Sequence, residues 1–182
     1  NISDGIFSNV NEDGIIQNVY FTGTMNVGQG YKGPLGSNMS GAIINCYTDI
    51  SGTGTCGFAR RLTDAGIVSN SYSVSEGKAG AFFNQYGTND TAGEGQLINT
   101  YWLETLDNSV IPERALVNSY SETKDYMKSL DFVSALNENK GENGVSWGRN
   151  GNTGYPYFGE SQNYNPGSTL PANKYTVKFT KF

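Results

Sequence analysis

The chain repeats a five-residue pattern in which an aliphatic residue, an asparagine and a tyrosine are each separated by one residue. The five copies are Ile16–Tyr20, Ile43–Tyr47, Val68–Tyr72, Leu97–Tyr101 and Leu116–Tyr120. Their asparagines are Asn18, Asn45, Asn70, Asn99 and Asn118, so the intervals are 27, 25, 29 and 19 residues. A recurrence of this length is typical of repeat proteins in which each period forms one supersecondary unit.

Each copy of the pattern predicts a β-strand. Because successive side chains of a strand point to opposite faces, the aliphatic residue, the Asn and the Tyr should share one face. We expect this nearly invariant face to be the interior. A buried amide is costly unless it is hydrogen-bonded, and stacking Asn on Asn at the strand spacing of ~4.8 Å would supply the bond. The sequence therefore predicts a mainly β protein, a parallel β-solenoid (β-helix) of about four to five coils.

Glycines recur at two places in each predicted coil. One set begins the coils, at Gly5, Gly33, Gly57 and Gly80, and a second set precedes the strands, at Gly14, Gly41, Gly66 and Gly95. Glycine permits the backbone conformations that tight corners need. The fourth coil is the longest, and we expect its extra residues, within 84–95, to leave the solenoid wall as a loop.

Residues 123–139 predict the one helix of the chain. Ser121 or Thr123 could cap its start, and Gly141 could end it. A buried stripe at helical spacing would consist of Tyr126, Leu130, Val133 and Leu136. We expect this helix to lie across an open end of the solenoid and to cap its strand edges.

The rest of the chain is a loop-rich, aromatic segment followed by a possible strand. In residues 174–182, Tyr175, Val177 and Phe179 alternate with polar residues, after a linker containing Pro166 and Pro171. This strand either begins a neighbouring module or pairs back onto the solenoid. We divide the chain into repeats (1–120), a capping helix and loop closure of the same domain (121–165), and linker plus terminal strand (166–182).

The Gly-aliphatic-aromatic and Gly-x-Ile-x-Asn pattern, as in Gly5-Ile6-Phe7, resembles the GLUG-type repeats of secreted and cell-surface bacterial proteins. The stretch from Met127 to Asn137, then Trp147 and Gly154-Tyr155-Pro156, resembles the helix-and-loop closure that follows such repeats. Pro34 departs from the aromatic pattern. The likeness covers roughly residues 4–158. It implies a secreted or cell-surface, extracellular module with adhesive or carbohydrate-associated roles, and it brings no catalytic residues.

Composition excludes several kinds of chemistry. The chain has no His, which removes Ser-His-Asp and Cys-His catalysis and His-ligated metals. Cys46 and Cys56 are too few for a four-thiolate zinc site; they form either a disulfide or two thiols. A net charge of −5 without a basic cluster argues against nucleic acid, and no apolar run approaches ~20 residues, so we expect no membrane insertion.

Residues 9–14 partly resemble the start of a calcium loop. Asn9, Asn11 and Asp13 have the spacing of its first ligands, but Tyr20 stands where the bidentate Glu would be. We therefore predict a polar turn and no cofactor. No signal peptide is visible and the first residue is not Met, so we expect a segment of a larger surface protein with neighbouring domains.

We predict a non-catalytic carbohydrate-binding or adhesive module that stacks aromatic side chains on a polysaccharide or a host or dietary glycan. The candidate ligand-binding residues are Trp102, Tyr86, Trp147 and Tyr157. Strand alternation places Trp102 on the outward face, where a sugar could reach it. A structural spacer between domains is the alternative.

A second alternative is a polysaccharide lyase or glycoside hydrolase. Glycosidic cleavage needs two carboxylates, either ~5 Å or ~6.5–9.5 Å apart. The best candidates are Asp64, Glu76, Glu94 and Glu104, and none of these forms a suggestive pair in the sequence. We therefore predict that the protein is not an enzyme.

Overall fold

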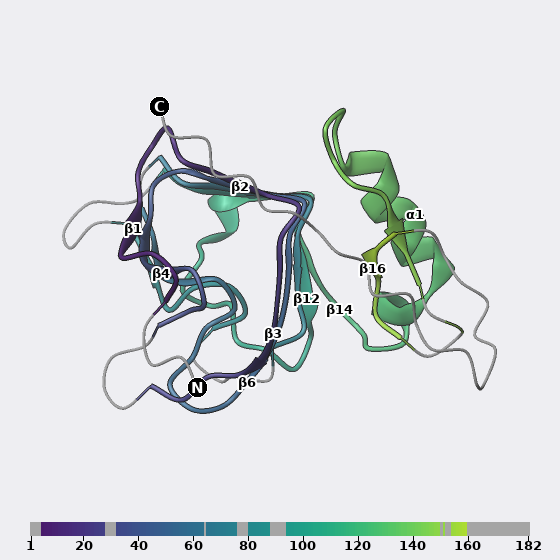
Figure 1. Cartoon of the computed structure of the whole chain (residues 1–182), viewed down its shortest axis with the longest axis horizontal. Coiled ribbons are helices and arrows are strands. Elements are labelled where there is room, and N and C mark those ends of the chain that lie inside the picture. Colours follow the sequence, from purple (N-terminus) through teal and green to yellow (C-terminus); the bar gives the residue numbers. More distant parts are fainter. Residues whose placement is uncertain are drawn as a thin grey trace.

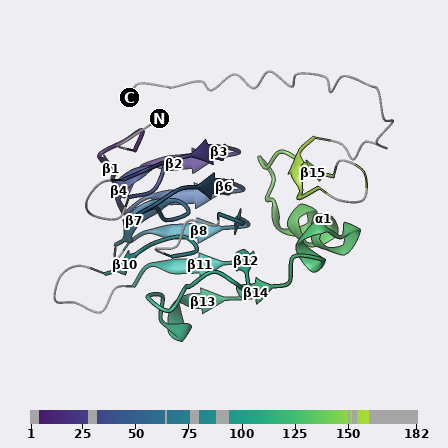
Figure 2. The ribbon, with the colours of Figure 1, turned by 90° about the horizontal axis from the view of Figure 1, so that it is seen from below.

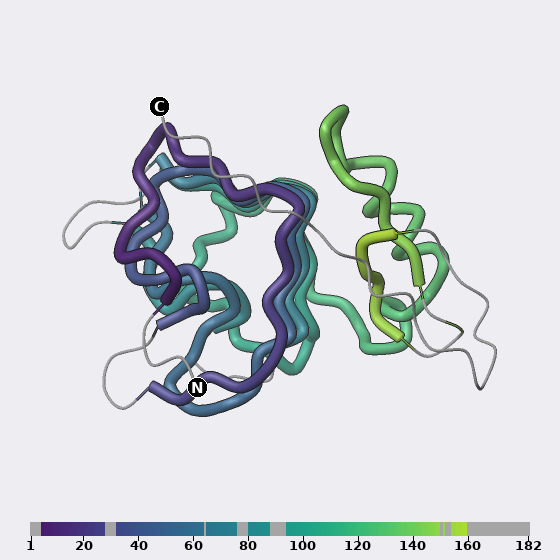
Figure 3. Tube along the Cα trace, viewed as in Figure 1, coloured from purple at the N-terminus to yellow at the C-terminus, as the bar shows by residue number. Residues whose placement is uncertain are grey.

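A computed structural model describes residues 5–27, 32–63, 65–75, 80–87, 94–149, 151 and 154–159. Three parallel sheets wind around a common axis into a β-solenoid (Figures 1 and 3). The main architecture predicted from the sequence is therefore confirmed: the protein is mainly β, its sheets are parallel, and the described residues contain one α-helix. Residues 160–182, with the predicted terminal strand, lie outside the described residues.

Each sheet takes one strand from successive coils. Sheet A consists of β1 (Asn9–Val10), β4 (Gly36–Met39), β7 (Ala59–Leu62) and β10 (Gln85–Tyr86). Sheet B consists of β2 (Ile15–Gln17), β5 (Ala42–Ile44), β8 (Ile67–Ser69), β11 (Gln96–Ile98) and β13 (Leu116–Val117). Sheet C consists of β3 (Tyr20–Thr24), β6 (Tyr47–Ser51), β9 (Tyr72–Ser73), β12 (Tyr101–Leu103) and β14 (Tyr120–Glu122). Strand β10 lies within the loop predicted for 84–95; residues 88–93 are outside the described residues.

The strand register places equivalent residues of the five copies above one another. Ile16 pairs with Ile43, which pairs with Val68, and the series continues to Leu97 and Leu116. These aliphatic side chains point into the solenoid, where Ile43, Val68 and Leu97 are fully buried. The predicted stacking of the repeats is thus confirmed.

The five asparagines change the direction of the side chains that follow them. All five have left-handed backbone conformations, with φ between 42° and 57°. Among residues with a Cβ, Asn tolerates this conformation best. Each Asn forms the corner between sheet B and sheet C and interrupts the alternation of the strands. The residue after Asn45, Cys46, therefore points inward, and Tyr47 points outward.

The prediction that the Asn and Tyr side chains face the interior is therefore wrong. The tyrosines form an outer row on sheet C, which we call the tyrosine row; it consists of Tyr20, Tyr47, Tyr72, Tyr101 and Tyr120. The first three rings stack, with centroids 5.2 Å and 5.1 Å apart. Tyr72 is nevertheless fully buried, because a second layer covers the middle of the row.

The predicted hydrogen bonds between asparagines are present in the first three coils. Asn45 Nδ2 donates to Asn18 Oδ1 (2.7 Å), and Asn70 Nδ2 donates to Asn45 Oδ1 (2.8 Å). We call Asn18, Asn45 and Asn70 the asparagine ladder. Asn99 instead donates to Asn139 Oδ1 (3.1 Å). The ladder therefore lies at a corner of the solenoid, between its wall and the covering layer.

The covering layer consists of the helix and a small hairpin. Helix α1 (Leu130–Asn139) follows the 3₁₀ turn η2 (Tyr126–Lys128), and the hairpin pairs β15 (Trp147–Gly148) with β16 (Tyr157–Phe158). Figure 2 shows α1 and β15 beside the stack of strands. The prediction that the helix covers a solenoid end is wrong. Its apolar face packs on the tyrosine row, where Phe132 contacts Tyr72 and Tyr101 edge to face.

The helix also starts later than predicted. Ser129, rather than Ser121 or Thr123, caps α1 by accepting a hydrogen bond from the Phe132 amide (3.1 Å). This start turns the buried side to Phe132, Val133 and Leu136, and it leaves Leu130 56% exposed. The predicted end is consistent with the structure, since Gly141 follows with φ of 70°.

The C-terminal end of the solenoid is closed by the chain itself. Residues between β12 and β13, including the 3₁₀ turn η1 (Glu113–Ala115), fold over the last coil. Ile111 and Ala115 are buried in the core there, and Leu106 and Val110 pack against it. This plug performs the role that the sequence suggested for the helix.

Substitution of Asn45 tests the ladder. Glycine keeps the left-handed conformation available, so Asn45→Gly removes mainly the amide, which also accepts from Trp147 Nε1 (2.6 Å). Leaving buried partners without their bonds should lower the free energy of unfolding by about 2–4 kcal/mol. The control is Asn118→Gly, at an exposed corner with φ of 47°, which should change stability little. Equal losses in urea unfolding would contradict the ladder.

Two substitutions in α1 distinguish the observed helix face from the predicted one. Phe132→Ala should cost about 3–5 kcal/mol in the free energy of unfolding, since the ring is fully buried. Leu130→Ala should cost less than about 0.5 kcal/mol, because that side chain is mostly exposed. Chemical denaturation of both variants measures the difference, and a larger loss for Leu130→Ala would favour the sequence-based stripe.

Candidate functional site

Trp102 does not offer a face to a ligand. It is 8% exposed and packs inside the solenoid, with its ring edge to face with Phe82 at 6.1 Å. The outward position predicted for it is wrong, because the left-handed Asn99 shifts the alternation by one residue. Trp102 therefore belongs to the core, on the opposite side of sheet C from Tyr101.

Trp147 and Tyr157 belong to the covering layer. Trp147 is 2% exposed; its ring lies 4.5 Å from Phe158 and 5.6 Å from Tyr72, measured between centroids. Tyr157 is half-buried and pairs with Gly148 across the hairpin. The structure places these two residues together, on the outside of sheet C, but separates them from Tyr86, which lies in sheet A.

Tyr86 lines a pocket of about 330 Å³ at the junction of sheets A and B. The lining mixes polar and apolar surface and consists of Tyr86, Glu94, Gly95, Gln96, Arg114 and Ala115. It combines strand β10, the start of β11 and the turn η1. We call this the Tyr86 pocket. Its volume falls within the range of small-ligand sites, about 300–1,000 Å³.

The side chains of the Tyr86 pocket are held in defined positions. The Tyr86 hydroxyl donates to the Gly95 carbonyl (2.8 Å), which fixes the ring against the wall. The Arg114 guanidinium carbon lies 5.9 Å from the centroid of that ring, within the range of a cation–π contact. Glu94 and Gln96 are exposed at the same opening. An aromatic face, a cation, a carboxylate and an amide thus surround one small volume, a set that can bind a hydroxyl-rich ligand.

The sequence named Tyr86 and Glu94 but missed Arg114. A signal for it exists in the repeat register. Leu97 pairs with Leu116, so the residue two before Leu116, Arg114, takes the place that Gly95 holds in the coil before. Aligning the last copy with the glycines before the strands would have placed an arginine beside the end of the fourth-coil loop.

Of the four acidic candidates the structure describes two, Glu94 and Glu104, and these two do not line one pocket. Asp64 and Glu76 lie outside the described residues. Glu94 is the one carboxylate in the lining of the Tyr86 pocket, as far as the structure describes it. Glu104 follows strand β12 and lies near Glu122 of β14; burial, and then Glu104, raise the pKa of the Glu122 carboxyl. These two acids lie at the ends of neighbouring strands of sheet C and do not line that pocket.

The two cysteines are separate buried thiols. Cys46 lies in the solenoid core, with its sulfur 3.2 Å from the Ile44 carbonyl, and the Cys56 sulfur lies 2.9 Å from the Ala59 carbonyl. Burial raises the pKa of each thiol from 9.0 to about 12. Of the two possibilities that the sequence left open, the structure contains the thiols and not the disulfide.

The described residues also bear on metal binding and on membrane insertion. In the part of the chain that the structure describes, no three residues among His, Cys, Asp and Glu are grouped as metal ligands would be. Asn9 Oδ1, in the partial calcium-like sequence, accepts from Asn38 Nδ2 (2.7 Å). No helix of the described ranges is long and apolar enough to cross a bilayer.

Thiol labelling tests the environment of the cysteines. At pH 8 the native protein should react with a thiol reagent at least about a hundredfold more slowly than the unfolded chain, because the reactive thiolate is suppressed. Because the pKa of each thiol is higher in the folded protein, the two protonated thiols contribute fully to stability below pH 9.0. That contribution is lost as the pH rises from 9.0 to about 12. Both thiols should react with the reagent in denaturant without added reductant. If neither reacts, the two cysteines form a disulfide.

Comparisons with protein-family models, with curated proteins and with solved structures found no match for this chain. Its function is therefore inferred from the repeat pattern and from the geometry of the described residues.

Proposed function

We propose that this chain is a non-catalytic carbohydrate-binding module of a bacterial cell-surface protein, and that the Tyr86 pocket holds the glycan. The observation that carries the proposal is the combination of Tyr86, Arg114, Glu94 and Gln96 around one opening. The likeness of the repeats to GLUG-type repeats supports the extracellular location and the presence of neighbouring domains. The Tyr86 pocket replaces the sequence-based candidate site centred on Trp102, because Trp102 is buried in the core.

Each group in the pocket has a use in sugar recognition. Aromatic rings stack on the apolar faces of sugar rings and retain a polar edge. The Tyr86 hydroxyl is already bonded to Gly95, so the ring is ordered before a ligand arrives, which lowers the entropic cost of binding. Carboxylate, amide and guanidinium groups together provide acceptors and donors for neighbouring hydroxyls. The presence of Arg114 favours glycans that carry a carboxylate, because guanidinium groups bind carboxylates through two parallel hydrogen bonds.

A binding role agrees better with the pocket than cleavage does. Hydrolysis of a glycosidic bond needs two carboxyl groups on either side of the bond, whereas the described lining contains only Glu94. A structural spacer remains the alternative function, and it differs from the proposal in one measurable property: a spacer binds no glycan.

Glycan binding to the whole chain tests the proposal. A glycan array that includes uronic-acid polysaccharides identifies ligands, and calorimetry measures their affinity. Tyr86→Ala and Arg114→Ala should each weaken binding about tenfold or more, equivalent to about 1.4 kcal/mol. Tyr86→Phe should keep most of the affinity, since the aromatic face remains.

The matched control is Tyr120→Ala, because Tyr120 is an exposed tyrosine, 54% accessible, on a different sheet. Its affinity should equal that of the unsubstituted chain. Binding that is lost in Tyr120→Ala but kept in Tyr86→Ala would move the site to the end of the tyrosine row. Absence of binding to every glycan on the array would favour the spacer.

A further inference from the structure

Sheet A carries a row of polar side chains on its outer face. Successive strands contribute one residue each at the same register position: Asn9, Asn38, Arg61 and Gln85. The residues that follow in β4 and β7, Met39 and Leu62, are fully buried, so alternation puts the row on the opposite, outer face. The four side chains are exposed or half-buried. We call them the outer ladder.

The members of the outer ladder are hydrogen-bonded in pairs. Asn38 Nδ2 donates to Asn9 Oδ1 (2.7 Å). Arg61 donates to Gln85 Oε1 through Nε (3.0 Å) and through Nη2 (2.7 Å). Because a guanidinium can only donate, Gln85 presents its oxygen to Arg61 and keeps the two N–H donors of its amide nitrogen for other acceptors. These bonds order the side chains before a ligand arrives, which lowers the entropic cost of binding.

The outer ladder leads to the Tyr86 pocket. Gln85 and Tyr86 are consecutive residues of β10, which is the last strand of sheet A. Figure 1 shows β1 and β4 of this sheet on the side of the solenoid away from α1, so the covering layer does not lie over the ladder. From β1 to β10 the ladder crosses three strand spacings, or ~14 Å. Ladder and pocket together therefore form one elongated polar surface along the solenoid axis.

Positive charge is concentrated on this surface. The strands of sheet A contain Arg60 and Arg61 and no Asp or Glu, and Arg114 lines the pocket. Three of the four arginines of a chain with a net charge of −5 thus belong to sheet A or to the pocket. Acidic residues flank the surface at its two ends: Glu12 and Asp13 follow β1, and Glu94 lines the pocket. The charge between these ends favours an anionic ligand, because guanidinium groups bind carboxylates strongly.

We propose that the glycan is a linear polysaccharide with carboxylate groups, and that it runs along the outer ladder with one end in the Tyr86 pocket. This inference rests on the proposed function and adds the class, the length and the direction of the ligand. Parallel strands lie ~4.8 Å apart, close to the ~5 Å that one pyranose unit spans in an extended chain. Each strand of sheet A therefore offers one polar side chain to each sugar unit.

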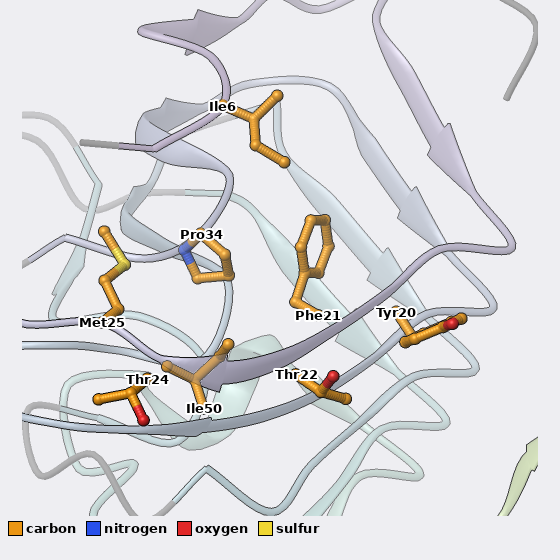
Figure 4. A pocket seen from close by; sticks show the side chains of 8 residues that line it. All are labelled: Ile6, Tyr20, Phe21, Thr22, Thr24, Met25, Pro34 and Ile50. Atoms are coloured by element: carbon orange, nitrogen blue, oxygen red, sulfur yellow. The ribbon is translucent and has the colours of Figure 1, made fainter. Parts of the chain in front are cut away.

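A second hollow, at the N-terminal end of the solenoid, lacks these features. It has a volume of about 380 Å³ and is lined by Ile6, Tyr20, Phe21, Thr22, Thr24, Met25, Pro34 and Ile50. Figure 4 shows these side chains, and none of them is charged or carries an amide. The hollow lies along β3 of sheet C, not along sheet A. It therefore suits an acidic glycan less well than the outer ladder and provides a control position.

The dependence of affinity on ligand length tests the inference. Calorimetry on the full chain uses oligogalacturonides and oligomannuronates of increasing length, from dimers to octamers. In at least one series the affinity should rise about tenfold or more between dimer and pentamer, because units beyond the pocket meet the ladder at a high effective concentration. It should change little for longer oligomers, which extend past Asn9. Neutral cello-oligosaccharides of the same lengths should bind more weakly, since they have no carboxylate for Arg61.

Substitutions in the outer ladder separate it from the pocket. Asn38→Ala and Arg61→Gln should each weaken binding of hexamers at least about fivefold more than binding of dimers. Tyr86→Ala should weaken binding of both. The controls are Gln17→Ala, at a half-buried glutamine of sheet B, and Thr22→Ala in the N-terminal hollow, and both should leave hexamer binding unchanged. All of these side chains except Tyr86 lie outside the core, so the variants should fold.

The outcomes distinguish this inference from the proposed function. Affinity that does not depend on length, with binding still lost in Tyr86→Ala, would overturn the inference and leave the proposed function standing. Binding of a glycan on the array without binding of either acidic series would do the same. Equal losses in Asn38→Ala and Gln17→Ala, or a loss in Thr22→Ala, would overturn the location on sheet A. Absence of binding to every glycan tested would overturn both.

Discussion

The left-handed asparagine is the constraint on which the rest of this structure depends. Each coil turns from sheet B to sheet C at a residue with φ between 42° and 57°, a conformation that costs most side chains about 1–2 kcal/mol. Asn accepts it at lower cost and, in addition, its amide can bond to the coils above and below. The same residue therefore makes the corner and holds successive corners in register.

These amides also position the covering layer. The Val145 amide donates to Asn18 Oδ1 (2.9 Å), and Asn45 Nδ2 donates to the Val145 carbonyl (3.0 Å). Asn70 Nδ2 donates to the Leu136 carbonyl (2.9 Å), near the end of α1. The wall alone would leave the amides and the tyrosine row in water. With the layer in place, a row of tyrosines becomes a second core, and the Tyr72 hydroxyl bonds to the Pro156 carbonyl. The closure and the repeats thus depend on each other.

The sequence predicted the solenoid, the stacking of the copies and the ladder because each follows from spacing alone. The sequence-based prediction failed where a single backbone φ angle decides which face of a sheet a side chain occupies. Nothing in the alternation of Leu97, Asn99 and Tyr101 shows that Asn99 is left-handed, so Trp102 was placed on the wrong face. The general need to cover the strand edges of a solenoid predicts a helix at its end, but this helix covers the tyrosine row instead. The spacing of apolar residues predicts a stripe from Tyr126, whereas the helix capped by Ser129 buries Phe132. The Tyr86 pocket could be predicted only by aligning the short last coil with the longer fourth coil, because that alignment places Arg114 next to Gly95.

The asymmetry of the two solenoid ends follows from how the last repeat is built. The interval between Asn99 and Asn118 is 19 residues, too short for a strand in sheet A, and among the described residues that sheet has no fifth strand. The residues that would have formed it cross the end of the coil instead and bury Ile111. This crossing also brings Arg114 to Tyr86, so the same shortened repeat that closes the core forms one wall of the pocket. The first repeat has the full set of strands and no equivalent crossing in its described part. The core residues Phe21, Met25 and Ile50 therefore line an open groove at that end.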